Sequence, residues 1–103
     1  MTSSDDDRLI QLADIFHLMG EPNRLRMMVA CRDAAVSVGD IADRLGLSTS
    51  LVSQHLRLLK AARLLVSERR GKQVFYRAAD HHVRDVLTDM LDHLDEPGHD
   101  GAA

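Results

Sequence analysis

The sequence predicts a mainly α-helical domain with one small β-hairpin. Apolar residues recur at three- and four-residue steps in five stretches, which is the pattern of amphipathic helices. Two β-prone runs, 64–67 and 73–77, flank a short segment that contains a glycine, as in a hairpin. The 103 residues, of which 45% are apolar, suit one small core that gains stability from burying a dimer interface.

The composition and the first residues of the chain indicate where in the cell the protein is located and how its single cysteine is placed. The chain has no apolar run near the roughly 18 residues of a membrane span. Its acidic start, MTSSDDD, lacks the basic-then-apolar order of a secretion signal. We therefore expect a cytoplasmic protein with no membrane partner. Cys31 is the only cysteine, and its apolar neighbours predict a packed thiol.

The predicted domain spans residues 8–96. Residues 1–7 are polar and acidic and predict a disordered tail, whereas residues 97–103 predict a flexible one. Within the domain, a first packing helix ends at Gly20. A second helix starts at Pro22 and continues to about Ala35.

A helix-turn-helix follows these two helices. Apolar positions from Val38 to Leu45 define a short helix that Gly46 closes. Ser48 leads directly into a longer helix that runs to about Ala62. Two helices joined by so short a turn form a helix-turn-helix.

The longer of these two helices carries a polar face suited to a DNA major groove. Six polar side chains fall within an arc of about 140°: Thr49, Ser50, Ser53, Gln54, Arg57 and Lys60. Serine, threonine and glutamine can meet base edges there, while Arg57 and Lys60 would contact phosphates. His55 falls in the apolar arc and is interpreted as a core histidine with satisfied hydrogen bonds.

The predicted hairpin has a basic tip. Arg69, Arg70 and Lys72 would bind phosphates or a minor groove beside the recognition helix, so the two units together predict a winged helix-turn-helix. The chain has a net charge of −3, yet residues 44–77 hold eight Lys and Arg against one acid. This distribution indicates a protein that binds double-stranded DNA.

The last predicted helix, capped by Asp80 and stopped at Pro97, carries two pairs of metal-ligand residues. Asp80 and His82 lie at its first turn, and His93 and Glu96 at its last. His82 and His93 share a face but stand about 16 Å apart, so one ion cannot reach both. The pairs meet only if a second copy runs antiparallel, which predicts a two-fold homodimer with two inter-chain sites. The alternative is a solvated polar stripe on a dimer helix.

The chain resembles the ArsR/SmtB family of metal-responsive repressors from about Leu9 to Glu96. The resemblance lies in the segments LMGEPNRLRM, VSVGDIADRLGLSTSLVSQHLRLLKAARLL and GKQVFYRAADHH. The pattern Asp-x-His, ten residues, then His-x-x-Glu is similar to the C-terminal helix site of the zinc-sensing SmtB branch, at the four residues named above. It implies a homodimer, formed through the N- and C-terminal helices, that binds an operator with an inverted repeat and releases it when metal binds.

The donor set indicates which metals to expect. Two imidazoles and two carboxylates suit four-coordinate Zn(II) or Co(II), whereas Ni(II) usually takes further ligands. His81 and His99 are available but are expected to lie outside the site. Relatives that sense arsenic, cadmium or lead carry a Cys-x-Cys before the recognition helix, where this chain has Ser37 and Gly39. A thiolate site is therefore not expected.

Other functional classes fit the sequence less well. A zinc enzyme needs an open coordination position for water, which four protein ligands do not leave, so we expect no enzyme. A dimeric interaction module without DNA would leave the basic segment unexplained. A repressor of the same family that responds to a non-metal signal remains the alternative.

Overall fold

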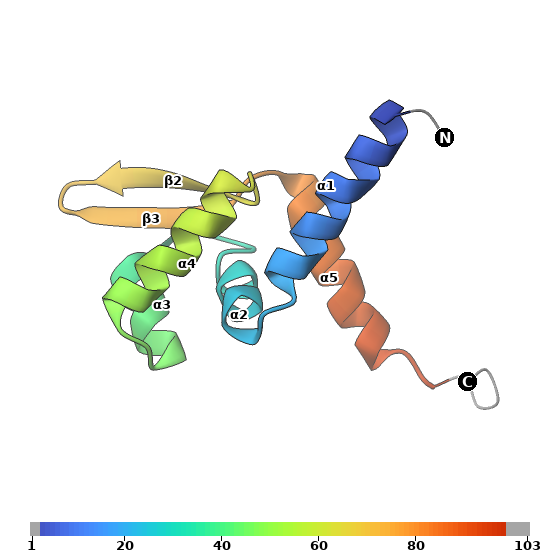
Figure 1. The fold of residues 1–103 in the computed structure, drawn as a ribbon. Coiled ribbons are helices and arrows are strands. Elements are labelled where there is room, and N and C mark those ends of the chain that lie inside the picture. Colours follow the sequence, from blue (N-terminus) through green and yellow to red (C-terminus); the bar gives the residue numbers. More distant parts are fainter. Residues whose placement is uncertain (1–2, 99–103) are drawn as a thin grey trace.

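The computed structural model describes residues 3–98, which form five helices and a three-stranded sheet (Figure 1). In chain order the elements are α1 (Ser3–Met19), α2 (Pro22–Ala30), β1 (Val36–Ser37), α3 (Val38–Leu45), α4 (Thr49–Ala61), β2 (Leu65–Arg70), β3 (Gln73–Ala78) and α5 (His81–Asp95). The mainly α-helical winged helix-turn-helix is thereby confirmed. None of the helices within residues 3–98 is long and apolar enough to cross a membrane.

Helix α1 begins earlier than predicted. Residues 3–7 belong to it, so the prediction of a disordered tail is wrong for them. Asp5 and Asp6 lie in the first turn, where carboxylates interact favourably with the positive end of the helix dipole. The acidic composition therefore marks the start of a helix. Residues 1–2 and 99–103, which complete the two predicted tails, lie outside the described residues.

Capping residues fix the boundaries of the helix-turn-helix. Ser37 begins α3 because its Oγ accepts a hydrogen bond from Asp40 N at 3.1 Å. Gly46 ends α3 with a φ of 69°, which a glycine adopts without strain. Ser48 begins α4 in the same way, accepting from Leu51 N at 3.1 Å. Both helices thus form where the sequence predicts them.

The hairpin also forms, and its first strand, β2, reaches further towards the tip than predicted. β2 and β3 pair antiparallel along their whole length, ending at Arg70 opposite Gln73. Gly71 and Lys72 make a two-residue turn, and Gly71 takes a positive φ of 63°. The short turn keeps the basic tip on regular, paired backbone.

The sequence does not predict strand β1, which adds a third strand to the hairpin. Helix α2 ends at Ala30, short of the predicted Ala35, and the chain then extends so that Val36 of β1 pairs with Tyr76 of β3. The sheet order is β1-β3-β2. This pairing holds the start of α3 against the base of the hairpin, so the wing and the helix-turn-helix share one core.

The core lies between α2, α3, α4 and the sheet. Its fully buried large side chains are Met27, Met28, Cys31, Ile41, Val52, Leu56, Leu59 and Leu65. The thiol of Cys31 is packed as predicted. Burial raises its pKa to about 12, so the thiol stays protonated at neutral pH.

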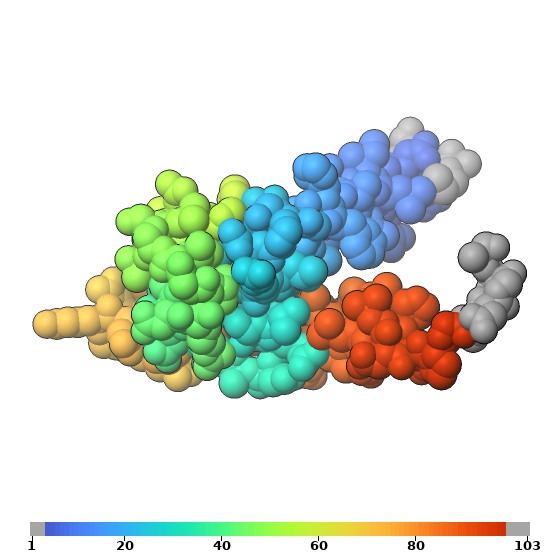
Figure 2. Space-filling view, turned by 90° about the horizontal axis from the view of Figure 1, so that it is seen from below, coloured from blue at the N-terminus to red at the C-terminus, as the bar shows by residue number. Residues whose placement is uncertain are grey.

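Helices α1 and α5 leave most of their apolar side chains exposed. Their large exposed hydrophobic residues are Leu9, Ile10, Leu12, Phe16, Val86, Met90, Leu91 and Leu94. Figure 2 shows that both helices extend to one side of the body and diverge towards their far ends. Of their described residues only Met19 and Leu87 are buried, so these helices lack a covering partner within the described chain.

Candidate nucleic-acid interface and metal site

Helix α4 presents the predicted polar face to solvent. Its first two turns and Arg57 line one shallow hollow, formed by Thr49, Ser50, Ser53, Gln54 and Arg57. The apolar side of the same helix supplies Val52, Leu56 and Leu59 to the core. Because the core fixes the rotation of the helix, small hydrogen-bonding side chains and one guanidinium face outwards together, as groove reading requires.

Lys60 lies at the junction of α4 and the hairpin. Its Nζ donates a hydrogen bond to Ser67 Oγ on β2 at 2.7 Å. The contact ties the end of the recognition helix to the base of the wing. Lys60 therefore has a structural partner within the chain besides the phosphate that the sequence predicts for it.

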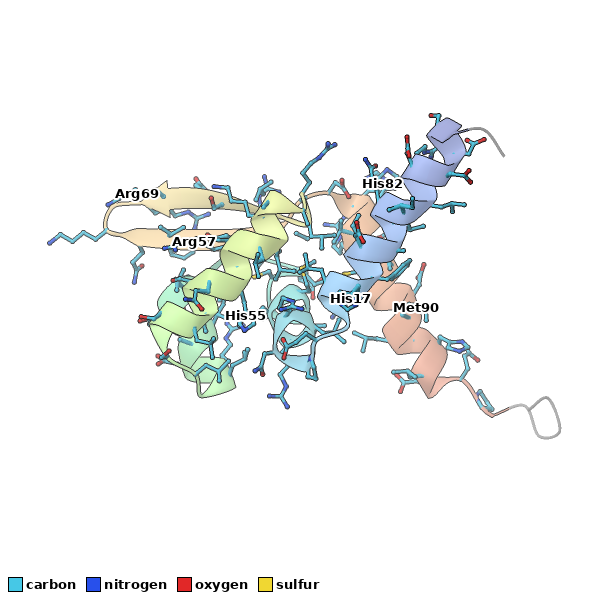
Figure 3. The ribbon with its side chains drawn as sticks, in the orientation of Figure 1. His17, His55, Arg57, Arg69, His82 and Met90 are labelled. Carbon is cyan, nitrogen blue, oxygen red and sulfur yellow. The ribbon has the colours of Figure 1, made fainter. Side chains whose placement is uncertain are left out.

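Two of the three basic residues at the tip of the hairpin, Arg69 and Arg70, make different contacts. Arg70 forms an ion pair with Glu68 at 3.0 Å, and its guanidinium lies 4.5 Å from the centre of the Phe75 ring. Arg69 donates from Nε to the carbonyl of Gly71 at 3.1 Å. Figure 3 shows Arg69 and Arg57 at the same end of the molecule, away from α1 and α5. The basic tip and the polar face of α4 are therefore brought together.

The structure corrects the interpretation of His55. The sequence predicts a core histidine with satisfied hydrogen bonds, and the side chain is half-buried on the helix face opposite the groove-reading residues. Its Nδ1, however, is buried with no hydrogen-bond partner within the described chain. Glu21, the N-cap of α2, interacts electrostatically with His55. The N–H of Arg24 lowers the pKa of Glu21, and the charge of His55 lowers it further.

The predicted metal ligands lie at the two ends of α5. Asp80 is its N-cap and accepts a hydrogen bond from Val83 N at 3.0 Å, which holds the pKa of that carboxyl below its usual range. His82 is exposed in the first turn, with its ring 3.9 Å from that of His81. His93 lies in the last turn, and Glu96 is the C-cap.

One chain does not complete a metal site. Within residues 3–98, no three His, Cys, Asp or Glu side chains come close enough together to hold a metal ion. Asp80 and His82 together offer one carboxylate and one imidazole, which are ligands that zinc accepts. The donor atoms of Asp80 and His82 therefore suit a metal ion, but two donors are fewer than the four that zinc takes. A second pair is needed to complete the site.

The first-turn pair opens into a large hollow that sequence analysis does not predict. Asp80 and His82 line a space of about 780 Å³ together with Asp14 and His17 of α1 and Arg63, which follows α4. Figure 3 labels His17 and His82 on their two helices. Only the folded chain brings α1 to this point, because its residues lie more than 60 positions away in the sequence.

Arg63 has an unusual backbone in this hollow. It adopts a positive φ of 64°, which L residues rarely take. Its N–H bonds to the carbonyl of Lys60 at 2.9 Å, and that of Leu64 bonds to Leu59 at 3.0 Å. These two bonds form a Schellman motif at the end of α4, with arginine in the place where glycine is usual. The end of the recognition helix is thus fixed beside the first-turn pair.

Comparisons with known proteins find a family of bacterial regulatory proteins and individual transcriptional repressors that are similar to this chain. The family described as "Bacterial regulatory protein, arsR family" matches residues 21–67. The chain is 38% identical to a transcriptional repressor SmtB homolog from Synechocystis over 87% of this chain and 68% of that protein. It is 35% identical to the HTH-type transcriptional repressor SmtB of Mycobacterium tuberculosis over 81% of this chain and 62% of the relative's length.

A solved structure is similar over nearly the whole fold. It is the homodimeric winged helix-turn-helix DNA-binding domain of a possible ArsR-family transcriptional regulator from Mycobacterium bovis. The TM-score is 0.85 at 23% identity, covering 93% of this chain and 89% of that one. At this level of identity, the similarity establishes the fold alone.

Proposed function

This chain belongs to the ArsR/SmtB family of metal-responsive transcriptional repressors, and on that premise we propose that it is a homodimeric repressor controlled by Zn(II), with Co(II) or Ni(II) as alternatives. Members of the family are DNA-binding regulators, so the chain is not an enzyme. In this proposal the dimer binds operator DNA in the cytoplasm. It releases the DNA when metal occupies sites shared between the two chains, and metal efflux or resistance genes are then expressed.

The observation that carries the proposal is the separation of two donor pairs on one helix. Asp80 and His82 lie at the start of α5, and His93 and Glu96 at its end. At a rise of about 1.5 Å per residue, His82 and His93 are about 16 Å apart. Zinc binds its ligands at about 2 Å, so an antiparallel α5 from a second chain is needed to bring the pairs together.

The surface between the two pairs supports the same arrangement. Val86 and Met90 lie within about 80° of His82 and His93 around the helix, and both are exposed. A second α5 would remove these side chains from water, which favours association. One interface would thereby stabilise the dimer and assemble two equivalent sites.

The donor chemistry decides between classes of metal. Two imidazoles and two carboxylates favour Zn(II) or Co(II), and the bound ion would supply the charge that holds the two α5 helices together. Thiophilic metals lack a site among the described residues, because Cys31 is buried and protonated.

The dimer also provides the geometry for DNA binding. Two recognition helices related by a two-fold axis would occupy successive major grooves, about 34–36 Å apart, on an inverted repeat. Arg57, Arg69 and Lys72 would displace counterions from the phosphates, so affinity would fall as salt rises.

The response requires a physical connection between α5 and α4. A ligating histidine usually donates its second N–H to a carbonyl or carboxylate. In our proposal His93 of the partner subunit donates towards the end of α4 near Arg63, which lines the hollow of the first-turn pair. Metal binding would then bias the position of the recognition helix, with a coupling free energy of about 1–3 kcal/mol.

The test uses two defective proteins that complement each other. One carries Asp80→Ala and His82→Ala, and the other His93→Ala and Glu96→Ala. Each homodimer lacks one pair at every site, so neither should bind zinc tightly. In the heterodimer one site loses both pairs and the other keeps both, so one tight zinc per heterodimer should reappear. Zinc titration and mass spectrometry of the intact dimers measure this number.

The same proteins test the regulatory role. Operator affinity, measured by fluorescence anisotropy, should fall on adding zinc to the wild type and remain unchanged for either defective homodimer. Heterodimers that recover no zinc would exclude an inter-chain site. An operator affinity insensitive to zinc, cobalt and nickel would instead favour a repressor that responds to a non-metal signal.

A further inference from the structure

A second hollow beside the start of α5 is lined by three arginines. Arg32 follows α2, Arg77 lies on β3, and Arg84 lies near the start of α5. The hollow has a volume of about 210 Å³. Neither the groove-reading residues nor the proposed metal site uses these arginines, so the meeting of three guanidiniums from separate parts of the chain needs another explanation.

The three guanidiniums have hydrogen-bond donors to give. Within the described chain, the side chain of Arg84 forms no hydrogen bond or ion pair. Arg77 donates from Nη1 to the carbonyl of Ala78 at 3.2 Å, and a guanidinium has further N–H groups. Arg32 pairs with Asp33 at 3.3 Å, which is longer than the about 2.7–2.9 Å of a strong charge-assisted hydrogen bond. An incoming anion therefore displaces no strong contact.

The charge around the hollow favours an anion. Besides the three guanidiniums, the hollow is lined by two carboxylates, those of Asp33 and Asp80. Asp33 accepts from Arg32, and Asp80 accepts from Val83 N as the N-cap of α5. The positive end of the α5 dipole also lies here, because His81 is the first residue of that helix and lines the hollow. Positive charge therefore predominates.

A backbone hydrogen bond fixes the frame of the hollow. The N–H of Ala78 donates to the carbonyl of Cys31 at 3.0 Å, which joins the end of β3 to the residue after α2. Arg77 and Arg32 are the chain neighbours of these two residues, so this bond sets how far apart their backbones lie. Two of the three arginines are thus held in position before a ligand arrives, which lowers the entropic penalty of binding.

The hollow lies away from both the DNA-reading face and the proposed dimer interface. Tyr76 of β3 is buried in the core that α4 also joins. Arg77 is the next residue and is exposed, so its side chain lies on the opposite face of the sheet. On α5, Arg84 lies about 160° around the helix from Val86, which faces the proposed partner. A small ligand can therefore reach the hollow in the dimer and in its complex with DNA.

We propose that Arg32, Arg77 and Arg84 bind the phosphate group of a small molecule, or inorganic phosphate itself. A guanidinium donates parallel N–H bonds to two oxygens of an oxyanion. Phosphate has enough terminal oxygens for three guanidiniums, whereas a carboxylate has only two. The hollow is smaller than the about 300–1,000 Å³ of pockets for drug-sized ligands, which limits the ligand to a small one. This inference goes beyond the proposed function and does not depend on a metal.

Calorimetric titration of the metal-free chain with inorganic phosphate tests the site, with acetate at the same ionic strength as the comparison ligand. Arg84→Ala removes an exposed side chain that has no polar contact within the described residues, so the fold should be retained. Arg84→Lys keeps the charge and removes the planar fork. Arg26→Ala is the matched control, because Arg26 is an exposed arginine of α2 outside the hollow.

The wild type and Arg26→Ala should bind phosphate equally and acetate more weakly. Arg84→Ala should lose about 10- to 100-fold in phosphate affinity, because it removes hydrogen bonds from a charged group. Arg84→Lys should lose less than Arg84→Ala. Equal phosphate affinity in the wild type and Arg84→Ala would overturn the inference, and so would acetate binding as tight as phosphate binding.

Operator DNA distinguishes a small ligand from a phosphate of the DNA backbone. With a small ligand in the hollow, Arg84→Ala should leave operator affinity and its salt dependence unchanged, and saturating DNA should leave phosphate affinity unchanged. If Arg84→Ala lowers the salt slope of operator binding by about 1, the DNA backbone occupies the hollow and the small-ligand assignment is wrong.

Discussion

The body of the molecule and the α1–α5 region bury their apolar side chains to very different extents. All the large side chains that are fully buried come from the segment that begins with α2 and ends with β2. Helices α1 and α5 supply most of the large hydrophobic residues that remain exposed. Figure 2 shows these two helices extending away from the body on one side.

This difference distinguishes the region that is complete in a single chain from the region that we expect a second chain to complete. The body has a closed core and presents its DNA-reading face whether or not a second chain is present. The α1–α5 region has an exposed apolar surface, and the four candidate metal ligands lie at the two ends of α5. In the proposed function, assembly and metal sensing are therefore located together, and recognition of DNA is located apart from them.

The largest expected effect comes from placing a charge in the α1–α5 region. Met90 is 57% exposed in the single chain. Met90→Glu should weaken the dimer by about 100-fold or more, about 3 kcal/mol, because a carboxylate would be buried in the interface without a partner. Sedimentation as a function of concentration measures the change, and operator affinity should fall with it.

Leu58→Glu is the matched control in the body. Leu58 lies on α4 and is 50% exposed, so it resembles Met90 in size and exposure. The substitution should leave the dimer intact. If both variants dissociate equally, or if neither does, exposure on α5 does not identify the interface.

A smaller effect is expected from cutting the connection between the two regions. His93→Asn removes the imidazole N–H that we propose reaches towards the end of α4. The variant should bind operator normally without zinc and should lose the zinc-dependent weakening, which is about 5- to 150-fold for typical coupling. Asp92→Asn is the control, because Asp92 is an exposed residue of α5 beside His93 and is not one of the proposed ligands. A normal zinc response in His93→Asn would refute this route.

The smallest effect concerns the body alone. His55→Leu should raise the free energy of unfolding by about 1–2 kcal/mol, because it removes a buried nitrogen that has no hydrogen-bond partner. Urea unfolding at fixed protein concentration measures the shift. His55→Gln keeps a polar group there and should give no such gain. Destabilisation by leucine would mean that Nδ1 has a partner in solution.

The features that sequence predicted well depend on short-range signals. Ser37 and Ser48 cap their helices, and Gly46 closes the first of them, so three nearby residues specify the helix-turn-helix. The hairpin follows from Gly71 between two β-prone runs. Asp80 likewise marks the start of α5. Each signal acts within a few residues, where chemistry and spacing can be read directly.

The features that sequence missed depend on distant contacts. Strand β1 exists because Val36 pairs with Tyr76, 40 positions away, and two residues carry too little pattern to predict it. The unsatisfied nitrogen of His55 follows from the packing of α4 and not from its position in the helix. The hollow beside Asp80 and His82 exists only because the folded chain brings α1 next to the start of α5.

The hydrogen bond between Lys60 and Ser67 has a consequence for the entropy of DNA binding. Immobilising a long, flexible side chain at an interface costs about 0.5–1.5 kcal/mol. Lys60 is already held to the base of the hairpin at 2.7 Å, so α4 and the wing are oriented relative to each other before DNA arrives. Lys60 therefore loses little further side-chain entropy when DNA binds, and the preformed arrangement favours DNA whose groove and backbone match it.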